Sequence, residues 1–325
     1  MKQYLQIIED GDTLSEDQAE QALNLIMTGN ADESEVAALL SGMAKRGESE
    51  SEIIGMLRGM RSQMVKIDLG NDLLDTCGTG GDGLSTFNIS TTVALICAAL
   101  GVKVAKHGNR AASSKSGSAD VLEALGVPIE LSGGDAKEYF NEHNFVFLFA
   151  RTYHPAMKHV ASVRKELGIR TIFNFLGPLA NPAGVTRQIV GVSNPEKAKS
   201  IGNALMALGA EHVLVIFSED GMDEASIATP TSVLDFKLGH MEEFTVQPRQ
   251  IFSLADIAGG EPEENAQLIK NLAIGNVHAA VKEAVILNAG LALYTADDVS
   301  SYQQGIEKVE EFLNSGEFDN YLQKL

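Results

Sequence analysis

The sequence predicts an α/β fold, with a small all-helical N-terminal domain followed by a larger α/β domain that has a mostly parallel central sheet. Two observations predict this division. In the first 65 residues apolar side chains recur at helical spacing, as at Val36, Leu39 and Met43. Beyond that region, short β-like runs alternate with helical runs. We therefore place a helical domain at residues 1–65 and the α/β domain at residues 70–325.

Capping signals support the helical part. Ser15 is followed three residues later by Gln18, and Asp32 by Glu35, and an amphipathic run follows each pair. The apolar positions of this part suit a subunit interface or packing on the same chain equally well. The candidate strands are residues 73–76, 102–105, 145–149, 188–192, 213–217, 233–236 and 243–246. The last two strands favour an antiparallel hairpin.

Composition narrows the class of protein. The 325 residues carry a formal net charge of -19 and a pI near 4.7, which argues against nucleic acid or an anionic membrane as a partner. The first residues are too charged for a signal peptide, and no run approaches the ~20 apolar residues of a membrane span. Cys77 and Cys97 lie in apolar runs without metal-ligand spacing. We expect a cytoplasmic protein.

One region departs from the acidic character of the chain. Residues 83–119 contain no Asp or Glu, and they hold the cations Lys103, Lys106, Arg110 and Lys115. An acidic protein that keeps carboxylates out of one region, beyond what an apolar core explains, indicates a bound anion there.

A glycine-rich loop lies at the start of this region. Residues 78–83 read GTGGDG, between the first candidate strand and a helical run that begins near Ser90 and Thr91. Glycines let successive N–H groups form a concave anion nest, and the helix N-terminus adds unpaired N–H donors. The spacing matches neither a P-loop nor Gly-x-Gly-x-x-Gly, so the loop alone is a weak signal.

The second candidate strand leads into a similar arrangement. Residues 106–110 read KHGNR, a hydroxyl-rich stretch follows, and another helix begins near Asp120. Ligands of open α/β sheets bind at the carboxyl ends of the strands, where both loops would lie. Two adjacent anion sites predict a phosphorylated, and by preference a pyrophosphorylated, small molecule.

A second acid-poor region follows. Between His143 and Pro195 the single acid is Glu166, against six cations, so we interpret this region as a wall of the same anion site. Arg164 could bind a carboxylate in a bidentate fork, although its position alone suits a surface helix. A loop stiffened by two prolines is expected at residues 174–182. His107 and His154 fit structural or functional roles.

A pair of acids follows the strand at residues 213–217. Asp223 and Glu224, together with phosphate oxygens of a substrate, could hold Mg²⁺. The alternative is a solvated acidic turn, and we expect that for Glu219 and Asp220.

Seven motifs follow one another along the chain. They are DTCGTGGD at 75–82, FNIST at 87–91, KHGNR at 106–110, residues 113–126, HPAM at 154–157, residues 170–182 and MDE at 222–224. In this order, and over nearly the whole chain, they resemble the motifs of the anthranilate phosphoribosyltransferases. The sequence departs slightly at Ala161-Ser162, where a proline is expected in many members of that family.

The resemblance implies a Mg²⁺-dependent enzyme of tryptophan biosynthesis. It would transfer the 5-phosphoribosyl group from phosphoribosyl pyrophosphate to the amine of anthranilate, giving N-(5-phosphoribosyl)anthranilate and pyrophosphate. It also implies a homodimer formed through the helical domain, with residues near 162–174 joining that domain.

The resemblance further implies a role for each matching residue. Catalysis would be electrostatic, through Lys106 and Mg²⁺, with no obligatory general base. Anthranilate would be held by Gly78, Asn109 and Arg164. Mg²⁺ would be placed by Ser90, Asp223 and Glu224. Phosphoribosyl pyrophosphate would be bound by Gly78, Gly81, Asp82, Thr86, Asn88, Ile89, Ser90, Thr91, Lys106, His107, Gly108, Asn109, Arg110, Ala111, Ala112, Ser113, Ser114 and Ser118.

Two alternatives remain from the sequence. A pyrimidine nucleoside phosphorylase would share the architecture and a glycine-rich phosphate loop, but it would have less use for the Asp223-Glu224 pair. A non-catalytic nucleic-acid-binding relative would require a basic face, which the net charge of -19 opposes.

Overall fold

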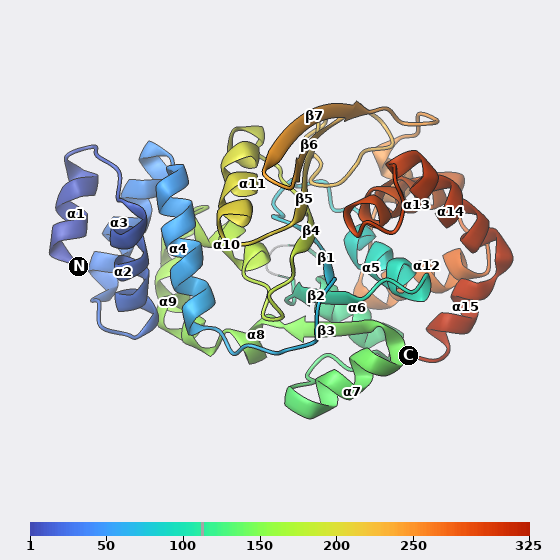
Figure 1. Ribbon diagram of the computed structural model, residues 1–325, viewed down its shortest axis with the longest axis horizontal. Coiled ribbons are helices and arrows are strands. Elements are labelled where there is room, and N and C mark those ends of the chain that lie inside the picture. The colour runs from blue at the N-terminus through green and yellow to red at the C-terminus, as the bar shows by residue number, and fades with distance from the viewer. Residues whose placement is uncertain (112–113) are drawn as a thin grey trace.

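The computed structural model describes residues 1–111 and 114–325. Helices gather at one end of the molecule, and a seven-stranded sheet with further helices forms the rest (Figure 1). The N-terminal end begins with α1 (Lys2–Glu9), α2 (Glu16–Met27), α3 (Glu33–Arg46) and α4 (Glu50–Gln63). The predicted capping box at the start of α2 is confirmed, because Gln18 N–H donates to Ser15 Oγ and Ser15 N–H donates to Gln18 Oε1.

A later segment of the chain packs into the same helical end. Helices α9 and α10 contact α2, α3 and α4, and Val160, Val163 and Leu176 are buried in one core with them. The predicted loop at residues 174–182 is wrong for its first part, which continues α10. That helix is so short that Pro178 removes few of its hydrogen bonds. The segment consists of α8 (Ala150–Tyr153), η1 (Pro155–Met157), α9 (Lys158–Leu167) and α10 (Phe173–Leu179).

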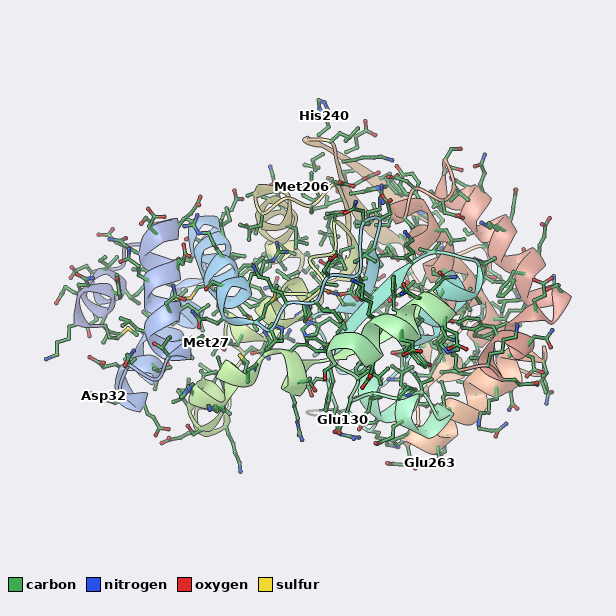
Figure 2. All side chains as sticks on the ribbon, turned by 60° about the horizontal axis from the view of Figure 1, so that its bottom comes forward. Met27, Asp32, Glu130, Met206, His240 and Glu263 are labelled. Atoms are coloured by element: carbon green, nitrogen blue, oxygen red, sulfur yellow. The ribbon has the colours of Figure 1, made fainter. Side chains whose placement is uncertain are left out.

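The sheet confirms the predicted α/β class. Its strand order is β3-β2-β1-β4-β5-β6-β7, with parallel pairing from β3 to β5 and antiparallel pairing of β5, β6 and β7. The predicted terminal hairpin is confirmed, and His240 marks its projecting tip in Figure 2. The strands are β1 (Leu74–Gly78), β2 (Val104–Gly108), β3 (Phe145–Phe149), β4 (Arg187–Gly191), β5 (His212–Ser218), β6 (Thr231–Lys237) and β7 (His240–Val246).

Helices cover both faces of the sheet. Helices α5 and α13 contact one face, and α11 contacts β5 and β6 from the side of the helical end (Figure 1). Among the described residues, none of the helices combines the length and apolar character that a membrane crossing requires. The remaining helices are α5 (Ile89–Ala99), α6 (Ser118–Leu125), α7 (Gly133–His143), η2 (Pro195–Lys197), α11 (Ala198–Ala207), η3 (Leu254–Ile257), α12 (Pro262–Ala273), α13 (Ala279–Thr295), α14 (Tyr302–Ser315) and α15 (Glu317–Leu322).

The strand order also fixes where a ligand can bind. From β1 the chain proceeds to β2 and β3 on one side, and it then returns to β4 and β5 on the other side of β1. Such a reversal opens a crevice at the carboxyl ends of the strands on either side of it. Strand β1 ends at Gly78 and β2 at Gly108, and each leads into one of the two loops predicted to bind anions.

Candidate active site

A cavity of about 1210 Å³ lies at the carboxyl ends of β1 and β2, between the loops of the sheet and helices α9 and α10. It brings together most of the predicted site residues. Ile89 does not line it, because its side chain is buried in the core, and Ala112 and Ser113 lie outside the described residues. The predicted residues that line the cavity are Gly78, Gly81, Asp82, Thr86, Asn88, Ser90, Thr91, Lys106, His107, Gly108, Asn109, Arg110, Ala111, Ser114, Ser118, Arg164, Asp223 and Glu224.

The glycine loop after β1 forms one wall. Gly80, Gly81 and Gly83 have φ angles of 67°, 77° and 74°, a left-handed conformation that glycine adopts without strain. Gly80 N–H donates to Asp223 Oδ2 at 2.6 Å. Within the described part of the chain, the N–H groups of Gly81, Asp82 and Gly83 have no acceptor. The loop therefore offers unpaired backbone donors next to the cavity, as an anion nest requires.

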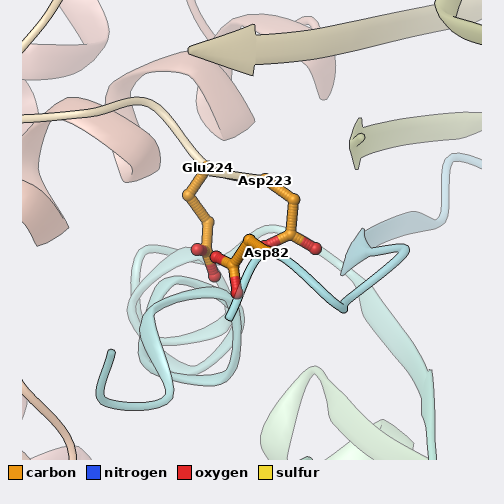
Figure 3. Close-up of side chains that lie close together, drawn as sticks. All are labelled: Asp82, Asp223 and Glu224. Carbon is orange, nitrogen blue, oxygen red and sulfur yellow. The ribbon is translucent and has the colours of Figure 1, made fainter. Parts of the chain in front are cut away.

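Three carboxylates converge beside this loop. Oxygens of Asp82, Asp223 and Glu224 lie within 4.8 Å of one another, and the side chains point toward a common centre (Figure 3). Burial, and then the neighbouring Asp82, raise the pKa of Asp223 to about 7. Burial, and then the neighbouring Asp223 and Asp82, raise the pKa of Glu224 as well. Carboxylates held this close are stabilised by a divalent cation, so the residues fit Mg²⁺.

Asp82 was predicted to bind pyrophosphate, and its place in the carboxylate cluster was not foreseen. Two adjacent acids, Asp223 and Glu224, indicated a metal site in the sequence, whereas a single acid in a glycine loop, such as Asp82, does not. Ser90, the third predicted metal residue, lies with Asp223 and Glu224 around one small recess.

Lys106 at the end of β2 contributes a buried ammonium group. Its side chain is 2% exposed, and Nζ donates to the Thr76 carbonyl at 2.5 Å and lies 3.4 Å from Ser90 Oγ. Burial lowers the pKa of Lys106, although the nearby Asp75 opposes that shift. Lys106 forms no ion pair with any described residue, and it lines the cavity, where a bound anion would supply an opposite charge.

The other cations of the acid-free region differ from Lys106. Arg110 pairs with Asp120 and Glu123, both at 2.8 Å, so carboxylates beyond the region already neutralise it. Lys103 and Lys115 do not line the cavity. The charge pattern predicted the right location, and of these four cations Lys106 is the one that lines the cavity without a carboxylate partner among the described residues.

Asn88 connects the two anion loops. Its Nδ2 donates to the Ser116 carbonyl at 3.1 Å, and its Oδ1 accepts from Asn265 Nδ2 at 2.9 Å. These contacts hold the start of α5 against the loop after β2. They use the side-chain amide of Asn88, which was predicted to bind the ligand.

Arg164 extends from α9 on the helical side of the cavity. It is half-buried, its guanidinium lies 5.6 Å from the ring centre of Phe173, and burial lowers its pKa. Among the described residues it has no carboxylate partner. Arg164 is therefore not a solvated surface arginine. A ligand with a carboxylate would supply the partner that it lacks.

The two histidines of the cavity are buried and close together. Their ring centres lie 4.9 Å apart, and His154 Nε2 is 3.0 Å from the Ala180 carbonyl. Burial lowers the pKa of His107 to about 3 and that of His154 to about 4. Both rings are therefore neutral at pH 7 and act as cavity wall, not as a cationic binding group.

Several lining residues were not assigned a role from the sequence, although Met157 and Arg170 fall within two of the shared motifs. Arg151 and Arg170 lie in the second acid-poor region, so its charge pattern could have indicated them. Met60 comes from α4 and Met157 from η1, and apolar residues of this kind carry no signal that separates a cavity wall from a core.

Comparison with known proteins agrees with this geometry. Residues 2–64 match the helical bundle domain of a glycosyl transferase family, and residues 70–318 match its a/b domain. The anthranilate phosphoribosyltransferases of Geobacillus kaustophilus and Bacillus subtilis are 46% and 44% identical to the chain. Each alignment covers 100% of this chain and 97% of the relative.

Solved structures give the same result. The crystal structure of anthranilate phosphoribosyltransferase from Thermus thermophilus matches with a TM-score of 0.92 and 41% identity, over 99% of this chain and 97% of that one. The Saccharomyces cerevisiae enzyme in complex with PRPP and Mg matches with a TM-score of 0.88 and 26% identity, over 99% and 95%. The chain therefore belongs to this glycosyl transferase family and, within it, to the anthranilate phosphoribosyltransferases.

Proposed function

We propose that the protein transfers the 5-phosphoribosyl group from phosphoribosyl pyrophosphate to the amine of anthranilate, giving N-(5-phosphoribosyl)anthranilate and pyrophosphate in tryptophan biosynthesis. One observation carries the proposal. Unpaired N–H donors, the buried Lys106 ammonium and a carboxylate cluster meet Arg164 in a single cavity. The related yeast enzyme, solved with PRPP and Mg, supports the same ligands here.

The cavity contains groups suited to the pyrophosphate of one substrate and to the carboxylate of the other. The N–H groups of Gly81, Asp82 and Gly83 suit pyrophosphate oxygens, and the hydroxyls of Ser90 and Thr91 lie at the adjacent helix start. Among relatives, the yeast enzyme has also been solved with 4-fluoroanthranilate, at 25% identity and a TM-score of 0.87. For anthranilate itself, the unpaired guanidinium of Arg164 suits the carboxylate.

The chemistry follows from where charge develops. Breaking the bond between ribose C1 and pyrophosphate moves negative charge onto the departing group, where Lys106 and the loop donors can stabilise it. When bound by Asp82, Asp223 and Glu224, Mg²⁺ supplies further charge neutralisation at the pyrophosphate oxygens. The aromatic amine is already neutral at pH 7, so no general base is required, and Arg164 acts by positioning it.

The decisive experiment follows anthranilate fluorescence after addition of phosphoribosyl pyrophosphate, with and without Mg²⁺. Loss of fluorescence that requires both additions is expected. No loss with folded protein would contradict the proposal and direct the test to thymidine or uridine with phosphate, the substrates of a pyrimidine nucleoside phosphorylase. The relatives named above favour the transferase over that alternative.

The wider organisation belongs to the same proposal. We propose a helical domain of residues 1–65, joined by residues near 162–174, and an α/β domain of residues 70–325. Burial of Val163, Ile172 and Phe173 in one core with the N-terminal helices supports the joining. We also propose a cytoplasmic homodimer formed through the helical domain, in keeping with the free thiols of Cys77 and Cys97. Sedimentation equilibrium measures the mass in solution, and a value of twice the 34.7 kDa chain mass would support the dimer.

A further inference from the structure

Arg170 spans the cavity from the helical side to the glycine loop. It lies on the connection between α9 and α10, two residues before Ile172, which is buried in the core of the helical end. Its Nη1 donates to the Gly81 carbonyl and its Nη2 to the Gly80 carbonyl, each at 3.0 Å. In the described chain Arg170 has no carboxylate partner. Its guanidinium is therefore committed to two consecutive backbone carbonyls of the glycine loop.

These two bonds determine which way the loop N–H groups point. In a trans peptide the C=O and the following N–H point in opposite directions. Holding the carbonyls of Gly80 and Gly81 toward Arg170 turns the N–H groups of Gly81 and Asp82 away from it. Those are two of the three unpaired donors described above. Ser193 Oγ also donates to the Gly80 carbonyl, at 3.2 Å, and reinforces the same orientation.

The contact between Arg170 and the loop also depends on the absence of a side chain at Gly81. A Cβ atom on Gly81 would lie 2.0 Å from Arg170 Nη1, closer than two unbonded atoms can approach. A glycine at this position thus permits both the left-handed backbone and the close approach of the guanidinium. The loop and the arginine form one unit, although they are 89 residues apart.

We propose that Arg170 is a positioning residue that aligns the glycine-loop N–H groups for pyrophosphate and links them to the helix that carries Arg164. The inference rests on the proposed function and extends it. Arg170 acts through the loop, and the side chain itself need not contact either substrate. Because the connection that bears Arg170 follows α9 directly, these two hydrogen bonds tie the glycine loop to the helical side of the cavity.

The test is the substitution Arg170→Ala in the full-length protein, assayed by the loss of anthranilate fluorescence. Removing two charge-assisted hydrogen bonds should raise the KM for phosphoribosyl pyrophosphate by about 10- to 100-fold. The KM for anthranilate should change less than about 3-fold, since Arg164 is untouched. Arg170→Lys keeps a cationic donor and should recover part of the loss. Lys165→Ala removes an exposed cation of α9 that does not line the cavity; it is the matched control and should leave both constants unchanged.

Three results would overturn the assignment. They are equal rises in both KM values, a fall in kcat alone, and wild-type kinetics in Arg170→Ala. If Arg170→Ala does not fold, Ser193→Ala removes the second donor to Gly80 and must raise the same KM to a smaller extent. Calorimetric titration with phosphoribosyl pyrophosphate and Mg²⁺ separates the two proposals. If the wild type shows no turnover, the proposed function is wrong. Weaker binding of phosphoribosyl pyrophosphate by Arg170→Ala than by the wild type would still support the positioning role.

Discussion

Gly191 at the end of β4 has no side chain, which leaves room for the segment that carries Asp223 and Glu224, two of the proposed metal ligands. An ideal Cβ at this position would lie 1.4 Å from the backbone oxygen of Asp223 and 2.4 Å from its carbonyl carbon. Both atoms belong to the main chain, so no side-chain rotation relieves the contact. In Gly191→Ala the segment at Asp223 must therefore retreat by roughly 1.5 Å or more to reach an ordinary contact distance.

That displacement acts directly on the carboxylate cluster. It would pull Asp223 from its 2.6 Å bond with the Gly80 N–H and spread oxygens that now lie within 4.8 Å. We expect the Mg²⁺ concentration for half-maximal activity to rise by about 10- to 100-fold, as when a group that orients metal ligands is removed. Overpacking of this kind also costs about 1–3 kcal/mol of folding free energy.

The assay is turnover by anthranilate fluorescence across a Mg²⁺ titration, with denaturant unfolding measured on the same preparations. Gly134→Ala is the matched control, because no atom lies within 4 Å of its Cβ position and its φ is not left-handed. Its Mg²⁺ dependence should equal that of the wild type, with stability unchanged or about 0.4–1 kcal/mol higher. A folded Gly191→Ala protein with wild-type Mg²⁺ dependence would refute the reasoning.

Three further predictions concern single side chains. Arg164→Ala should raise the KM for anthranilate by about 10- to 100-fold; abolished turnover at unchanged KM would contradict its role. Glu224→Gln should increase the Mg²⁺ requirement by about 10-fold, whereas exposed Glu219→Gln should not; an equal response of both would remove Glu224 from the metal site. The pKa of His154 is lowered to about 4, so as pH falls the unfolded chain takes up this proton before the folded one. His154→Gln should therefore lessen the stability lost between pH 7 and pH 5 by about 2 kcal/mol, measured by urea unfolding at each pH; an unchanged loss would contradict neutral burial of the ring.

The sheet could be predicted because local pattern and tertiary environment agree along its strands. All five residues of β3 (Phe145–Phe149) are apolar and buried, and the run is bounded by polar segments, so it is unambiguous as a strand. Residues 174–182 were harder, because two prolines and a glycine indicate a loop while the burial of Phe175 and Leu176 favours a helical turn. Tertiary packing decided in favour of the helix.

The site could be predicted where its residues are contiguous. The glycine loop and the KHGNR segment each combine backbone freedom with charge in a few residues, and topology brings them to one edge. The pairing of Arg110 with Asp120 and Glu123 could not be foreseen, because it depends on how far α6 turns back toward the loop. Arg170 lies in an acid-poor region and begins the shared motif at residues 170–182, but its role could not be predicted, since its partners are backbone carbonyls of a distant loop.

The late arrival of α9 and α10 in the helical core has a consequence during synthesis. Helices α2 to α4 leave the ribosome first, but Val160, Val163 and Leu176 complete their interior from about 100 residues further along the chain. At translation rates of 5–20 residues per second this delay lasts roughly 5 to 20 seconds. During that interval the nascent helical bundle presents an unfinished apolar face, which chaperones or a neighbouring nascent chain could occupy before α9 does.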